Sequence, residues 1–93
     1  MPEFRIFETE EFLKRLAGLQ PRDLKQIQRK LREYVYPQLR GEPFFGRNIK
    51  KLQGYSPDTW RYRIGLFRVF YTVDTEEGIL YILSVDLRRD AYR

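Results

Sequence analysis

The chain has 93 residues, and its 18 Lys and Arg against 13 Asp and Glu give a formal net charge of +5. This length predicts a single basic domain spanning residues 1–93, and a hydrophobic content of 42% suffices for one core. Because the chain contains no Cys and no His, thiolate nucleophiles, disulfides, thiolate or imidazole metal sites and His-based triads are excluded. We expect no metal and no cofactor, so any catalysis must use Arg, Lys, Tyr, carboxylates or hydroxyls.

Membrane insertion and secretion are not expected either. No stretch approaches the ~20 apolar residues that a membrane helix needs. The N-terminal residues lack the basic start and apolar run of a secretory signal. We therefore expect a cytoplasmic protein with no membrane partner.

The first half of the chain predicts one strand and two helices. Residues 2–8 are of β-forming type and predict the strand. Thr9 is expected to cap the first helix, and Gly18 is expected to end it. Pro21 suits the first position of the second helix, which Pro37 is expected to stop because proline disrupts a helix interior.

The second half predicts strands, because apolar or alternating runs are separated there by turn residues. These runs are residues 48–52, 60–64, 67–73 and 79–85. The order of elements predicts an α+β fold: an N-terminal strand, a two-helix hairpin, then an antiparallel strand meander with the helices on one face of the sheet. The other face of the sheet is left open.

A two-residue hairpin loop at residues 65–66 sets the register of the central strands. A Gly-first loop of this length pairs Arg63 with Arg68 and Arg61 with Phe70. These four side chains then share the open face, because the opposite parity holds the apolar set that the helices must cover. Two arginines opposite each other destabilise a sheet, and an anion between them would reverse that effect.

Continued alternation along residues 79–85 adds an apolar strip to the open face. It places Leu80 and Ile82 there, beside Phe70 and the arginines. Such a strip suits either an amphipathic, acidic partner segment or the chain's own C-terminal tail with Leu87 and Tyr92.

More basic residues flank these strands. A concave basic sheet with an aromatic residue at its rim is typical of proteins that bind a bent phosphodiester and a splayed base. The alternative is a solvated sheet face that merely carries charge. The flanking residues are Arg47, Lys50 and Lys51 before the hairpin, and Arg88, Arg89 and Tyr92 after the last strand.

Two segments, LQGYSPDTWRYRIGLFRVFYTVD and ILSVDLRRDAY, resemble the RelE/ParE superfamily of type II toxin-antitoxin toxins, and the RelE branch in particular. The likeness covers nearly the whole chain and implies a RelE-like fold. It also implies a ribosome-dependent endonuclease that cleaves messenger RNA by attack of a ribose 2′-OH, inhibits translation, and is wrapped by a cognate antitoxin.

The resemblance also implies roles for single residues. Well-studied members carry lysines at the positions of Arg61 and Arg63, and arginine cannot be deprotonated to serve as a base. Tyr92 is expected to orient or accept the 2′-OH proton, or to stack on a base. The expected catalytic residues are Arg63, Arg68, Arg88 and Tyr92; the RNA-binding residues are Arg47, Lys50, Lys51, Arg61 and Arg89; the antitoxin-binding residues are Phe70, Leu80 and Ile82.

Two other functions fit the same resemblance. A ParE-like inhibitor of DNA gyrase would act by protein contact and would need neither Arg88 nor Tyr92. A non-catalytic RNA- or protein-binding member of the superfamily would explain the loss of lysines on the second strand of the meander.

Overall fold

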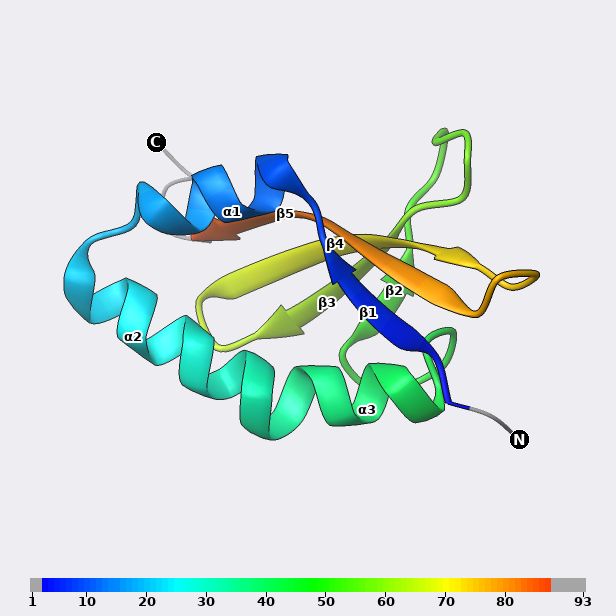
Figure 1. The fold of residues 1–93 in the computed structure, drawn as a ribbon, viewed down its shortest axis with the longest axis horizontal. Helices are drawn as coiled ribbons and strands as arrows, with labels where there is room; N and C mark the ends of the chain where they lie inside the picture. The colour runs from blue at the N-terminus through cyan, green and yellow to red at the C-terminus, as the bar shows by residue number, and fades with distance from the viewer. Residues whose placement is uncertain (1–2, 88–93) are drawn as a thin grey trace.

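Five strands form one mixed sheet, with the helices on one face, as the computed structural model shows for residues 3–87 (Figure 1). The strand order is β1-β5-β4-β3-β2; β1 pairs parallel with β5, and the other pairs are antiparallel. The expected α+β fold is confirmed. The elements are β1 (Arg5–Glu8), α1 (Glu10–Ala17), α2 (Pro21–Lys30), η1 (Leu31–Val35), α3 (Tyr36–Gly41), β2 (Ile49–Lys51), β3 (Trp60–Ile64), β4 (Phe67–Asp74) and β5 (Ile79–Leu87).

Helix α1 begins and ends as the sequence predicts. The Thr9 side chain accepts a hydrogen bond from the Phe12 backbone N–H at 3.3 Å, and Gly18 is the C-cap. The Thr9 hydroxyl also donates to the Ile82 carbonyl at 2.7 Å. One residue therefore starts the helix and fixes it to strand β5. Between residues 3 and 87, no helix is long and apolar enough to cross a membrane.

The prediction that the second helix stops at Pro37 is wrong. The helix continues through the π-helical turn η1 into α3, which ends at Gly41. In η1 the Tyr36 N–H bonds to the Leu31 carbonyl, five residues back. A proline needs no N–H donor in the first turn of a helix, and the wider π turn relieves its clash with the preceding turn. Pro37 therefore lies in the first turn of α3.

The β3–β4 hairpin confirms the predicted register. Ile64 pairs with Phe67, Arg63 with Arg68, and Arg61 with Phe70. Gly65 has φ +59°, the backbone conformation that the first position of this tight loop requires and that glycine adopts without strain.

The alternation predicted along β5 is wrong for its first half. The β4–β5 ladder shifts register between Phe70 and Tyr71, which pair with Ser84 and Ile82 and leave Leu83 as an extra residue. A β-bulge of this kind exchanges the two faces of a strand. Leu80 and Ile82 therefore lie in the core with no exposed surface. They cannot form an apolar strip on the open face.

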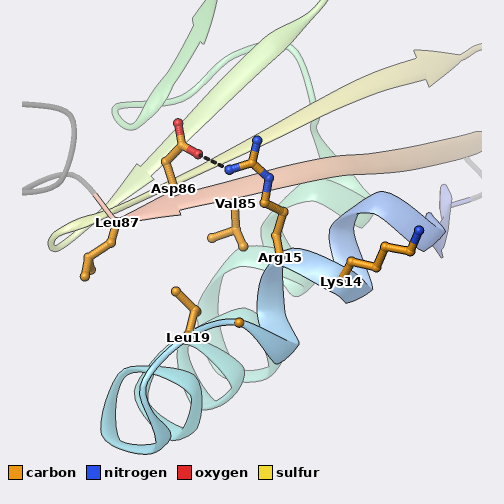
Figure 2. A pocket seen from close by; sticks show the side chains of 7 residues that line it. Lys14, Arg15, Leu19, Val85, Asp86 and Leu87 are labelled. Atoms are coloured by element: carbon orange, nitrogen blue, oxygen red, sulfur yellow. Dashed lines mark ion pairs between the residues drawn. The ribbon is translucent and has the colours of Figure 1, made fainter.

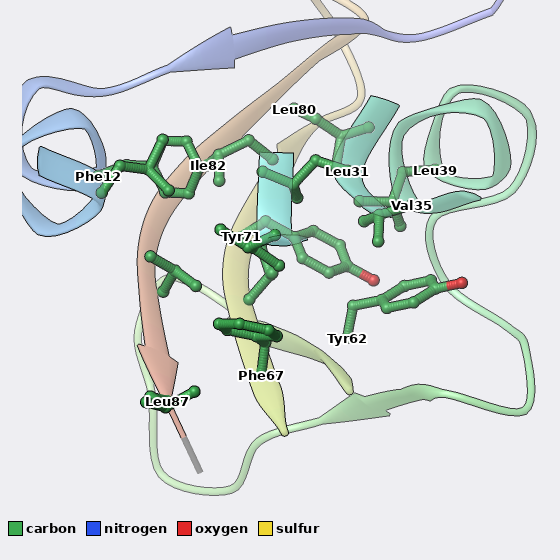
Figure 3. Close-up of a cluster of buried hydrophobic side chains, with 14 residues drawn as sticks. Phe12, Leu31, Val35, Leu39, Tyr62, Phe67, Tyr71, Leu80, Ile82 and Leu87 are labelled. Carbon is green, nitrogen blue, oxygen red and sulfur yellow. The ribbon is translucent and has the colours of Figure 1, made fainter. Parts of the chain in front are cut away.

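The core lies between the helices and the sheet (Figure 3). Two hydrogen bonds from buried tyrosines connect the sheet to α3 and the loop after it. Tyr62 Oη donates to Gln38 Oε1, and Tyr71 Oη donates to the Pro43 carbonyl, both at 2.7 Å. Burial raises the pKa of Tyr71 well above its ordinary value. These bonds supply partners for polar atoms that the core would otherwise leave unsatisfied.

Candidate nucleic-acid interface

Two rows of side chains cross the sheet on the face opposite the helices. Directly opposed residues on neighbouring strands share a face, so the register defines each row. The first row is Arg63, Arg68 and Asp86, on β3, β4 and β5; the second is Lys50, Arg61, Phe70 and Ser84, on β2, β3, β4 and β5. We call these seven residues the basic face. The two arginines that oppose each other in the first row thus have a carboxylate on the next strand.

Arg68 is the most constrained cation of the basic face. Its Nη2 lies 3.4 Å from Asp86 Oδ2, and its Cζ lies 5.8 Å from the centre of the Phe70 ring. Its side chain is 29% exposed, and its Nε is buried without a hydrogen-bond partner among the described residues. A guanidinium held this way is pre-oriented, and that reduces the entropy lost on binding an anion.

A cleft of about 460 Å³ opens beside Asp86, between the end of α1 and the end of β5 (Figure 2). Arg15 reaches across from α1, and its Nη1 lies 3.8 Å from Asp86 Oδ1. Arg15 also pairs with Glu11 at 3.3 Å. Asp86 therefore has one arginine on each oxygen. The cleft is lined by Lys14, Arg15, Gly18, Leu19, Val85, Asp86 and Leu87.

The structure brings together several of the predicted site residues. Arg61, Arg63, Arg68, Phe70 and Lys50 share the basic face. Arg63 and Lys50 are exposed, whereas Arg61, Arg68 and Phe70 are half-buried. The predicted arrangement of arginines on an open sheet face is confirmed, and their function remains a prediction.

Other predicted site residues lie elsewhere. Lys51 follows Lys50 in β2 and therefore lies on the other face of the sheet. Its Nζ pairs with Asp58 at 3.3 Å and lies 5.9 Å from the Trp60 ring centre. Arg47 is exposed in the loop before β2. Leu80 and Ile82 are buried, so the docking role expected for them is wrong. Arg88, Arg89 and Tyr92 lie outside the described residues.

Sequence reasoning missed Asp86 and Arg15. The hairpin loop fixed the β3–β4 register but not the β4–β5 register, so it left open which residue of β5 pairs with Arg68. One signal was available: Asp86 is an acidic residue at the end of an otherwise apolar strand, directly before Leu87 and two arginines. Arg15 carried no local signal, because its contact with Asp86 joins residues far apart in the sequence. No cluster of three potential metal ligands occurs among residues 3–87.

The chain matches a family of known toxins over most of its length. The family described as ParE toxin of type II toxin-antitoxin system, parDE, matches residues 8–92. A Methanocaldococcus jannaschii protein that bears the toxin name RelE1 is 32% identical over 91 residues, which cover 98% of this chain and 97% of the relative.

Solved structures of toxin-antitoxin complexes have the same fold. A chain of the RelBE2 complex from Mycobacterium tuberculosis is 29% identical, with a TM-score of 0.71 over 95% of this chain and 100% of the other. A chain of the RelE-RelB complex from Pyrococcus horikoshii OT3 is 24% identical, with a TM-score of 0.67 over 92% of this chain and 96% of the other. The second likeness, at lower identity, concerns the fold alone.

Proposed function

The chain belongs to the RelE/ParE superfamily of type II toxin-antitoxin toxins, and on that premise we propose that it is a ribosome-dependent endoribonuclease that cleaves messenger RNA. The observation that carries the proposal is the basic face, where Arg63 and Arg68 lie directly opposite each other. Paired cations on a sheet are unfavourable alone and become favourable when a phosphate lies between them.

The residues of the basic face match the needs of phosphodiester cleavage. Arg63 and Arg68 can stabilise the negative charge that grows on the attacked phosphate, as preorganised donors do in transition states. Phe70 offers a half-buried ring beside that position, on which a nucleobase can stack. Lys50 and Arg61 extend the positive charge towards strand β2 and can follow the RNA backbone.

Cleavage on programmed ribosomes tests the proposal. The purified protein should cut messenger RNA within the ribosomal decoding site, and Arg68→Ala should slow that cutting by ~100- to 1,000-fold, the usual cost of losing one such donor. Arg22→Ala is the matched control, since Arg22 is exposed on α2, outside the basic face. Equal rates of cutting by the wild type and a folded Arg68→Ala variant would show that the basic face takes no part in catalysis.

We also propose that a cognate antitoxin covers this face. Its acidic side chains would pair with Arg63 and Lys50, which are exposed, and oppositely charged surfaces associate in this way. Salt should accelerate dissociation in proportion to the exposed ion pairs. Complex formation that is unchanged in an Arg63→Glu, Lys50→Glu variant would place the antitoxin on another surface.

Inhibition of DNA gyrase is a second candidate, favoured by the ParE description of the matching family. A DNA supercoiling assay with purified gyrase separates the two functions. Blocked supercoiling without messenger RNA cleavage would replace the ribonuclease proposal.

A further inference from the structure

The basic face supplies positive charge, but RNA cleavage also needs a group that accepts the 2′-OH proton. Arginine cannot do this, because the guanidinium keeps its proton in proteins. The chain has no His and no Cys, and Tyr92, which the resemblance implies as a proton acceptor, lies outside the described residues. We propose that Asp86 is the catalytic general base of this site, an inference that rests on the proposed ribonuclease function.

The position of Asp86 supports this role. It lies in the same row as Arg63 and Arg68, directly opposite Arg68 on the next strand. A phosphate that contacts Arg68 would therefore have the carboxylate on the next strand, and neighbouring strands are ~4.8 Å apart. In the basic face, Asp86 is the one acidic residue.

The contacts of Asp86 leave it able to accept a proton. Its oxygens lie 3.4 Å from Arg68 and 3.8 Å from Arg15, distances longer than those of a tight charge-assisted hydrogen bond. The side chain is 34% exposed. A hydroxyl group approaching from solvent can therefore reach the carboxylate while the arginines hold it in place.

The cleft beside Asp86 gives the substrate a place. Its volume of about 460 Å³ lies within the range of small-molecule sites, and Asp86 and Leu87 form part of its wall (Figure 2). A ribose in its mouth would bring the 2′-OH next to the carboxylate while the adjoining phosphate meets Arg68.

Charged groups from each neighbouring element act on this carboxylate. Arg68 of β4 and Arg15 of α1 contact it directly, Arg63 of β3 lies beyond Arg68, and Lys14 of α1 lines the same cleft. The nearby Glu11 is bonded to Arg15 and neutralises part of its charge. The surroundings are thus mostly cationic, and the two arginines that contact Asp86 hold its carboxylate in place.

The proposed step exchanges one bond between phosphorus and oxygen for another. Asp86 takes the proton of the 2′-OH, and the 2′-oxygen forms a bond to phosphorus as the bond from phosphorus to the 5′-oxygen breaks. Solvent water donates a proton to the leaving 5′-oxygen, and Asp86 later releases its proton to solvent. The products are a 2′,3′-cyclic phosphate and a 5′-hydroxyl end.

The competing role for Asp86 is to position Arg68 through their ion pair. A double-mutant cycle separates the two roles, because a residue that acts only through Arg68 has no effect once Arg68 is gone. The variants are Asp86→Asn, Arg68→Ala and the double variant, with Glu33→Gln as control. Glu33 is an exposed carboxylate that pairs with Arg29 on the helix surface, away from the basic face.

The measurement is the single-turnover rate of messenger RNA cleavage on programmed ribosomes, with melting temperatures confirming the fold of each variant. Asp86→Asn should lose ~100-fold or more of the rate, the usual contribution of a general base, without weaker RNA binding. The double variant should be slower than Arg68→Ala by a similar factor. Glu33→Gln should match the wild type.

Chemical rescue gives a second readout. Asp86→Ala should regain part of its rate in formate, a small carboxylate that can occupy the vacated space, and chloride at the same ionic strength should restore nothing. The inference is overturned if Asp86→Asn cuts as fast as the wild type, if Asp86→Asn costs nothing in the Arg68→Ala background, or if formate has no effect. A wild-type protein that does not cut RNA would instead refute the proposed function.

Discussion

Replacing Ile82 by alanine tests the β-bulge that places the first half of β5 in the core. Ile82 has no exposed surface and packs in the main hydrophobic cluster (Figure 3). Its loss should lower the free energy of unfolding by about 3 kcal/mol, within the ~2–5 kcal/mol typical of such truncations, which combine lost burial with a residual cavity. A small domain has ~5–15 kcal/mol in total, so the variant should remain folded at room temperature.

The assay is thermal unfolding followed by circular dichroism. For a chain of this size, each 1 kcal/mol lowers the melting temperature by ~4–8 °C, so Ile82→Ala should lower it by ~12–24 °C. Leu83→Ala is the matched control, since Leu83 is the neighbouring residue, is the extra residue of the bulge, and is only half-buried. Its effect should be less than half as large.

Strict alternation along β5 makes the opposite prediction. Without the bulge, Leu83 would face the core and Ile82 the open side, so Leu83→Ala would be the more damaging change. A larger loss of melting temperature for Leu83→Ala than for Ile82→Ala would therefore refute the bulge.

Three further predictions concern stability. Tyr71→Phe should cost ~1–3 kcal/mol, measured by urea unfolding, because the buried Pro43 carbonyl loses its hydrogen bond. Burial raises the pKa of Tyr71 in the folded state, so the stability contributed by its protonated hydroxyl is full below the unfolded pKa of ~10 and declines above it. The urea concentration at the unfolding midpoint should therefore fall above pH ~10, and it should fall less in Tyr71→Phe. Gly65→Ala should cost ~1–2 kcal/mol because of its positive φ, whereas Gly41→Ala, with open space around its Cβ position, should be tolerated in the same melting experiment.

Local signals in the sequence were enough for the helix starts and the central hairpin. Thr9 and Pro21 mark helix starts through side-chain and backbone chemistry that acts within a single turn. The two-residue loop at Gly65 fixes which residues pair across β3 and β4, and that pairing puts Arg63 opposite Arg68. Four of the seven residues of the basic face could therefore be predicted before the fold was known.

Tertiary structure decided the rest, because β5 is apolar on both faces. In the run from Ile79 to Val85, alternation indicates no single register. Contacts from outside the strand hold this part of β5: Ile6 of β1 pairs with Leu80, and Thr9 donates to the Ile82 carbonyl. The bulge places Leu80 and Ile82 in the core, and the pairing of β4 with β5 sets Asp86 opposite Arg68. The sequence determined which cations share the open face, and only the packing of distant elements determined which carboxylate meets them.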